Sequence, residues 1–133
     1  MQDFRNLRVW EKAHKLALDA YRASAPMVRE GHFSPSKSGT RAALSVPANL
    51  AEGCGRTDDR ELRRFVRMAL GSASELEYHL LFARDLGLMP ERAHKQLTDA
   101  TIEVKRMLTG LASRLTDQIR KAESSTGKRT TES

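Results

Sequence analysis

Residues 58–87, DDRELRRFVRMALGSASELEYHLLFARDLG, decide the fold class of this chain. Thr57 or Asp58 can cap the start of a helix here, and Asp58-x-x-Glu61 resembles a capping box, in which two side chains satisfy free N–H groups of the first turn. Gly87, followed three residues later by a proline, is typical of a helix end. The sequence therefore predicts one long helix between these two signals.

The apolar residues of this helix point in several directions, so one neighbouring face cannot cover them all. They are Met68, Ala69, Leu70, Ala73, Leu76, Tyr78, Leu80, Leu81, Phe82 and Ala83. Either this is the central helix of a bundle, or it also meets another subunit. Residues 71–74, Gly-Ser-Ala-Ser, would let a second helix backbone approach closely. We favour that packing role over a catalytic serine, because no activating base is identifiable nearby.

The preceding residues predict two shorter helices. Between Leu7 and Ala25 apolar residues recur at three- and four-residue spacing, and Pro26 is expected to stop the helix. The inward residues would be Val9, Trp10, Ala13, Leu16, Ala17, Ala20 and Tyr21. Residues 29–39 lack this period and are rich in Gly, Ser and Pro, which predicts an exposed loop.

The second helix is expected from about Thr40 to Glu52, ended by Gly53, and Pro47 should bend it or tighten its last turns. Its inward residues would be Ala43, Val46, Leu50 and Ala51. Short connections between long helices favour antiparallel neighbours. We therefore predict an all-α fold in which residues 1–123 form one antiparallel, up-down four-helix bundle.

The fourth helix would begin at Pro90, since proline is tolerated at the first helical position, and extend to about Ala122. Its apolar positions follow alternating four- and three-residue steps, the seam of a bundle or coiled coil. They are Leu97, Thr101, Val104, Leu108, Leu111, Leu115 and Gln118. Residues 124–133 contain no apolar side chain, so we expect a disordered C-terminal tail.

Composition limits the class of protein. The net charge of +6 attracts polyanions, and the single cysteine cannot form an internal disulfide. No charged segment followed by an apolar segment opens the chain, and no run of eighteen apolar residues could span a bilayer. A cytoplasmic protein without a membrane anchor is the simplest expectation.

The corner between the second and third helices carries the residues Gly53-Cys54-Gly55-Arg56, which fit neither a P-loop nor a dinucleotide fingerprint. Two interpretations remain: a glycine-mediated corner, or backbone N–H groups around Gly55 that hold an anion together with Arg56. We favour the corner. Cys54 is expected to pack rather than react, because no histidine is close in sequence.

No metal or cofactor site is predicted. A bundle can assemble ligands from facing helices, which makes Glu52, Glu75, Glu77, His79 and His94 candidates. However, the Glu-x-x-His motif of di-iron bundle proteins is missing. We therefore expect solvated or ion-paired carboxylates and no catalytic residue.

Two rows of basic residues are the candidate nucleic-acid-binding site. In the third helix, Arg60, Arg63, Arg64 and Arg67 stand at i, i+3, i+4 and i+7 and follow Arg56. The first helix carries Arg5, Arg8, Lys12 and Lys15. Such rows can neutralise several phosphates of RNA or DNA, giving salt-dependent binding without sequence preference. The alternative is a solvated face whose arginines pair with neighbouring carboxylates. No aromatic platform for stacking bases is evident.

Three segments resemble a bacterial four-helix-bundle family first known from open reading frames inside intervening sequences of large-subunit ribosomal RNA genes. They are DFRNLRVWEKAHKLALDAY (3–21), ALSVPANLAEGCGR (43–56) and RFVRMALGSASELEYHLLFARDLG (64–87). The matching motif residues are Pro47, Asn49, Glu52, Gly53, Gly55 and Arg56, then Gly71, Ser72, Ser74, Glu75 and Glu77. Upstream, this chain departs from the family pattern: Gly39, Thr40 and Arg41 stand where an aliphatic residue and two arginines are usual.

This family is similar to the accessory variability determinant of diversity-generating retroelements, a basic ring-shaped pentamer that binds nucleic acid and a reverse transcriptase. The resemblance implies a homo-oligomer with basic outer surfaces, expected to be a ring-shaped pentamer, and most members of the family have no established biochemical activity. The sequence thus predicts a non-enzymatic nucleic-acid-binding or scaffolding protein. The alternative is a protein-interaction module that holds a partner enzyme such as a reverse transcriptase.

Overall fold

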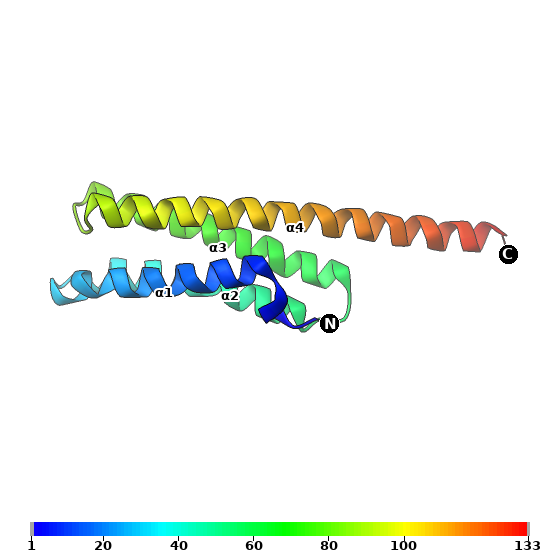
Figure 1. Cartoon of the computed structure of the whole chain (residues 1–133), viewed down its shortest axis with the longest axis horizontal. Coiled ribbons are helices and arrows are strands. Elements are labelled where there is room, and N and C mark those ends of the chain that lie inside the picture. The colour runs from blue at the N-terminus through cyan, green and yellow to red at the C-terminus, as the bar shows by residue number, and fades with distance from the viewer. Residues whose placement is uncertain (1, 133) are drawn as a thin grey trace.

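The computed structural model describes residues 2–132, apart from the side chains of Phe33 and of residues 127–132. Within this range the chain forms one short 3-10 helix and four α-helices (Figure 1). Their bounds are η1 Phe4–Asn6, α1 Arg8–Arg29, α2 Phe33–Cys54, α3 Asp59–Asp85 and α4 Glu91–Glu132. The predicted all-α class is confirmed for this part of the chain.

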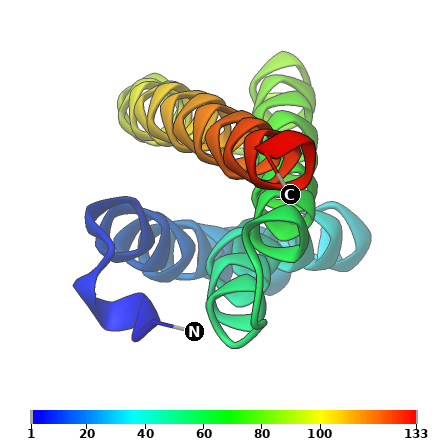
Figure 2. The same ribbon diagram turned by 90° about the vertical axis from the view of Figure 1, so that its right-hand side faces the viewer.

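Each α-helix runs antiparallel to the next, and the four surround a common core (Figures 1 and 2). Helix α2 packs against α1 and α3, and α4 packs against α3 and α1, whereas the backbones of the two diagonal pairs lie farther apart. This is the predicted up-down bundle. The α1–α4 contact is the sparsest of the four, and α4 extends beyond the other helices at the end where α3 begins.

Most of the predicted inward residues form the core. Leu16, Leu50, Leu76 and Leu108 are at most 2% exposed, one from each helix. Tyr21 is a wrong prediction: it lies beyond the edge of the buried stripe of α1 and is 67% exposed. Three further predicted positions are less buried than expected, namely Trp10 and Ala51, which are half-buried, and Gln118, which is exposed while Ile119 takes its place in the seam.

The prolines do not end the helices where the sequence suggested. Helix α1 continues through Pro26, because a proline fixes φ near its helical value and removes only one hydrogen bond. The helix ends instead at Arg29, two residues before Gly31, whose φ of 89° is left-handed. There the His32 N–H donates to the Met27 carbonyl at 2.8 Å, which satisfies a free C=O of the last turn.

Helix α2 begins seven residues before the predicted Thr40, at Phe33. Pro35 is its third residue, where a backbone N–H would have no partner within the helix, so the proline is tolerated. The loop predicted over residues 29–39 is therefore wrong, and residues 30–32 alone connect the two helices.

Helix α3 confirms the signals at its ends. The Asp58 carboxylate accepts a hydrogen bond from the Glu61 N–H at 2.8 Å. At the other end Gly87 has a φ of 68°, and the Leu88 N–H donates to the Ala83 carbonyl. Helix α4 then starts one residue after the predicted position.

Helix α4 continues past the predicted end at Ala122 as far as Glu132. No proline interrupts these residues, and the Thr126 hydroxyl donates to the Ala122 carbonyl at 2.9 Å. The side chains of residues 124–126 are exposed, and those of residues 127–133 lie outside the described part of the chain. A disordered tail over residues 124–133 stays a prediction.

Candidate nucleic-acid interface

The corner after α2 is built by close helix packing. A Cβ atom added to Gly53 would lie 2.8 Å from the Cβ of Phe65, closer than real Cβ atoms approach, and 3.0 Å from Cδ1 of Leu62. A glycine is therefore required for the end of α2 to meet the start of α3. This supports the interpretation of the Gly-Cys-Gly segment as a structural corner.

The serines around Pro47 and on α3 form one hydrogen-bonded contact. Pro47 cannot donate to the carbonyl one turn earlier, and it is followed by Asn49, whose side-chain amide donates to the Ser45 carbonyl at 2.8 Å and to the Ser45 hydroxyl at 3.0 Å. The Ser45 hydroxyl also lies 2.8 Å from the Ser72 hydroxyl on α3. The two most specific motifs of the sequence thus pack against each other.

The carboxylates considered as metal ligands have other partners. Glu52 pairs with Arg56 at 2.9 Å, Glu75 lies 3.3 Å from His79, and Glu77 pairs across helices with Lys105 at 2.9 Å. Among the described residues no group of three metal-ligating side chains gathers.

Cys54 is 2% exposed and belongs to the core. Burial raises the pKa of its thiol, and the carboxylate of Asp3 adds to that effect. A thiol held protonated is a poor nucleophile, which agrees with the packing role predicted for this cysteine.

The start of α3 does not offer an anion site. Its first-turn N–H groups face the capping carboxylate of Asp58, and Asp59 and Glu61 add negative charge to the same turn. A hydrogen bond from Arg64 lowers the pKa of Glu61, so this carboxyl is ionised. A phosphate here would meet like charges.

The predicted basic row on α3 is largely engaged in contacts within the protein. Arg60 pairs with Glu123 of α4, Arg63 donates to the Thr116 hydroxyl at 3.0 Å, and Arg64 donates to Glu61 at 2.8 Å. The guanidinium groups of Arg64 and Arg56 also lie over the Phe65 ring, 4.6 and 5.1 Å from its centroid. In the part of the chain that the structure describes, Arg67 alone of these five has no side-chain partner.

The basic row of the first helix has fewer contacts within the protein than the row on α3. Arg5 pairs with Asp3 at 3.3 Å and Lys15 with Asp19 at 2.9 Å. Arg8 and Lys12 are exposed and have no hydrogen bond or ion pair within residues 2–126. These two cations are available to an external anion.

A groove between α1 and α4 brings Arg8 together with two arginines that the sequence reasoning did not select. Arg8, Arg106 and Arg114 line this groove of about 420 Å³, with Glu103 as its one acidic lining residue. Arg106 lies 3.8 Å from Glu103, whereas Arg114 has no acidic partner among the described residues. The Arg114 guanidinium reaches back over Gly110, where a missing side chain leaves the groove open.

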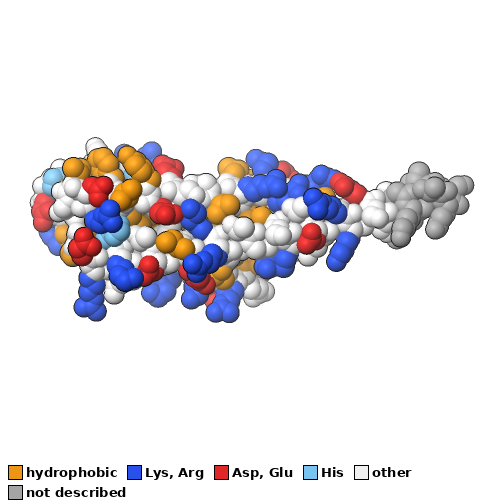
Figure 3. Space-filling view, turned by 90° about the horizontal axis from the view of Figure 1, so that it is seen from above, with side chains coloured by type: hydrophobic (Ala, Val, Ile, Leu, Met, Phe, Trp, Pro, Cys, Tyr) orange, Lys and Arg blue, Asp and Glu red, His pale blue; other side chains and the backbone are white. Residues whose placement is uncertain are grey.

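Arg114 also lines a second groove, of about 470 Å³, that adjoins the first at the end of the bundle and includes Arg56. Figure 3 shows Lys and Arg side chains scattered among acidic and hydrophobic ones over the described part of the face that carries α4. The sequence places Arg106 and Arg114 two turns apart on α4, but it does not reveal that the start of α1 lies opposite them. That relation depends on the tertiary fold.

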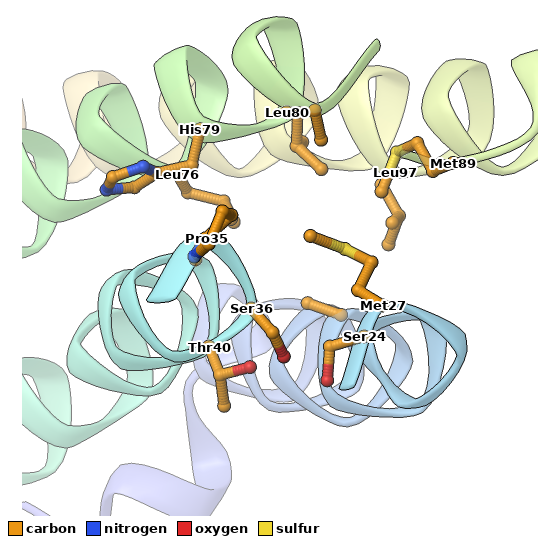
Figure 4. A pocket seen from close by; sticks show the side chains of 13 residues that line it. Ser24, Met27, Pro35, Ser36, Thr40, Leu76, His79, Leu80, Met89 and Leu97 are labelled. Carbon is orange, nitrogen blue, oxygen red and sulfur yellow. The ribbon is translucent and has the colours of Figure 1, made fainter. Parts of the chain in front are cut away.

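The opposite end of the bundle holds a small cavity (Figure 4). Met27 and Ser24 of α1, Ser36 of α2 and His79 of α3 line it, and its free space is about 30 Å³. A water molecule needs about 10–15 Å³ of such space. The cavity therefore fits a water molecule but no organic substrate.

No helix in the described part of the chain combines the length and the apolar character that crossing a bilayer requires. Together, the fold and the surface define an all-α bundle protein with a cationic groove between its first and last helices. The family model for 23S rRNA-intervening sequence proteins matches residues 5–110, and the chain belongs to this family. The family resemblance drawn from the sequence motifs is thereby confirmed.

A solved structure supports the fold. The crystal structure of a protein of unknown function from the S23 ribosomal protein family of Bacteroides thetaiotaomicron superposes with a TM-score of 0.76. The two sequences are 20% identical, and the match covers 78% of this chain and 97% of the other. At this identity the likeness shows the shared fold alone. A comparison with curated proteins gave no match.

Proposed function

We propose that this protein is a non-enzymatic, self-associating nucleic-acid-binding or scaffolding protein of the cytoplasm. Its central interaction is electrostatic contact between phosphates and the groove of α1 and α4. One observation carries the proposal: Arg8 and Arg114, from opposite ends of the sequence, line one groove without an acidic partner in the described structure. An arginine that has no carboxylate partner is hydrated. A phosphate that binds it therefore displaces only water and breaks no ion pair within the protein.

The physical basis is counterion release. Each phosphate that a Lys or Arg neutralises frees a cation from the nucleic acid, so affinity falls steeply with added salt. Lys12 stands one turn after Arg8 on α1 and extends the groove's positive charge along the helix. The paired arginines of α3 are exposed, and exposed pairs are weak, so these residues can exchange a carboxylate for a phosphate.

Self-association would multiply these contacts. On α3, Tyr78, Leu81 and Phe82 are 40–60% exposed, and the rings of Tyr78 and Phe82 lie 6.4 Å apart. Figure 3 shows hydrophobic side chains gathered at the end of the molecule where α3 ends and α4 begins. Such clusters favour association, and repeating a weak phosphate site around an oligomer raises avidity without new contacts. The ring-shaped pentamer implied by the family resemblance remains our working hypothesis for this assembly.

The test compares two variants of equal charge change. Fluorescence anisotropy measures binding of a labelled generic RNA or DNA fragment at about 50 and 200 mM salt. We expect R8E/R114E to lose most of the affinity and to reduce the salt slope. The control R92E/K95E changes the same number of charges near the start of α4, away from the groove, and should stay closer to the parent. Equal losses in both variants, or no binding by the parent, would overturn the proposal.

A second function is favoured by the same apolar cluster on α3. If Tyr78, Leu81 and Phe82 hold a partner enzyme, such as a reverse transcriptase, the protein acts as an interaction module. A co-purifying partner that survives nuclease and high salt would support this function over the nucleic-acid one. A partner lost on nuclease treatment would be bound through nucleic acid.

A further inference from the structure

The start of α1 carries an aromatic stack that is open to solvent. The rings of Trp10 and His14 lie parallel, with an interplanar angle of 8° and centroids 4.9 Å apart. Phe4 meets Trp10 edge-on at 4.8 Å and fixes the indole. Trp10 is half-buried and His14 is exposed, so the imidazole forms the outer layer of the stack.

Apolar groups continue from this stack along α1. Leu18 stands one turn after His14 and is 41% exposed, and Tyr21 follows and is 67% exposed. At about 100° per residue, the four side chains from Trp10 to Tyr21 share one flank of the helix. A monomer leaves this flank uncovered.

The basic row of α1 lies across the exposed half of the helix from the aromatic flank. Residues 8, 12 and 15 lie roughly 100° or more around the helix from residues 10 and 14. Arg8 lines the groove with α4, so cations occupy the side of α1 toward that groove. The exposed half of α1 thus presents charge along one edge and flat apolar surface along the other.

We propose that α1 binds single-stranded nucleic acid, with phosphates on Arg8 and Lys12 and unpaired bases stacked on His14 over Trp10. This inference rests on the proposed function and specifies its ligand. Basic side chains combined with an aromatic surface are what proteins use to hold single strands, because every base offers a flat face. In a duplex the bases are stacked on each other, and their faces cannot reach His14.

The chain supplies its own reporter, because Trp10 is its only tryptophan. Intrinsic fluorescence is followed while a twelve-nucleotide single strand, oligo-dT or oligo-rU, is added, and the titration is repeated with a twelve-base-pair duplex. We expect the single strand to quench Trp10 with saturation, and the duplex to bind more weakly with little quenching.

Two substitutions of the outer ring separate stacking from charge. H14L keeps bulk but removes the aromatic face, and we expect it to weaken single-strand binding by about fivefold to a hundredfold. H14F keeps an aromatic face and should restore most of the affinity and the quenching. Residue 14 is at the surface, and circular dichroism melting checks that both variants remain folded.

The outcomes distinguish this inference from the function on which it rests. Suppose that the single strand and the duplex bind equally, that both affinities depend on Arg8 and Arg114, and that Trp10 fluorescence does not change. The stacking inference is then wrong and the electrostatic function stands. Equal affinities of H14L and H14F would also overturn stacking. If neither strand binds, both proposals fall.

Discussion

Phe65 occupies the space in which a side chain at position 53 would lie: a Cβ on Gly53 would be 2.8 Å from the Cβ of Phe65. Because both atoms are close to their backbones, neither can move without shifting a helix. The α2–α3 corner therefore depends on one missing methyl group.

The first prediction concerns this contact. G53A should destabilise the fold by about 1–3 kcal/mol, the usual cost of overpacking a core. The matched control is G71A on the exposed face of α3, where an added Cβ meets no atom within 4 Å. Since alanine favours helix over glycine, G71A should stabilise by up to about 1 kcal/mol. Urea unfolding measures both, and a neutral G53A would contradict the packing explanation.

The second prediction concerns the contact between the two sequence motifs. If the Ser45 and Ser72 hydroxyls bond as their 2.8 Å separation indicates, a double-mutant cycle of S45A and S72A should show coupling of about 1 kcal/mol. A cycle of S72A with T98A, which lies on α4, is the reference and should be additive. Additivity in the Ser45–Ser72 cycle would show that the two hydroxyls do not interact.

The sequence predicts the fold correctly where a local signal is compatible with only one local structure. Asp58 and Gly87 mark the ends of α3 because a free carboxylate and a left-handed glycine have few other uses at such positions. Pro26 and Pro35 misled because a proline is compatible with the helical φ. Whether it breaks a helix depends on the packing around it, which the sequence pattern does not contain.

The candidate site could be predicted only in part from the sequence, for a related reason. Periodicity selected Arg60, Arg63 and Arg64 correctly as neighbours on one helix, but their partners Glu123 and Thr116 lie more than fifty residues away in sequence. Arg114 faces Arg8 only once α1 and α4 are packed side by side. The stack of Trp10 on His14 was missed although four-residue spacing is a local signal, because ring orientation is not a property of spacing.

The third prediction follows from the burial of Cys54. Because burial raises the pKa of this thiol, the unfolded chain loses its proton first as the pH rises. The contribution to stability is complete below the unfolded pKa, about 8.5, and declines above it toward the folded pKa. The free energy of unfolding, measured in urea at pH 7 and at pH 9.5, should therefore fall more between these two pH values for the parent than for C54A. An equal loss in both would exclude Cys54 as the cause.

The same burial predicts slow alkylation. Iodoacetamide reacts with thiolates, so native Cys54, which is both protonated and 2% exposed, should react far more slowly than the urea-unfolded chain. Mass spectrometry of quenched samples follows the modification. Rapid modification of the native protein would show that the end of α2 opens readily.

The last prediction concerns self-association. If the apolar end of α3 is the contact between subunits, L81E should introduce a charge into that contact and lower the mass found by light scattering, while circular dichroism shows the helices intact. Leu44 on α2 is also exposed, at 61% against 41% for Leu81, which makes L44E a control with the same substitution on another helix. We expect L44E to keep the assembly of the parent. If instead L44E dissociates the assembly and L81E does not, the contact between subunits lies on α2 and not on α3. If the parent protein is monomeric at all concentrations, self-association is not part of the mechanism.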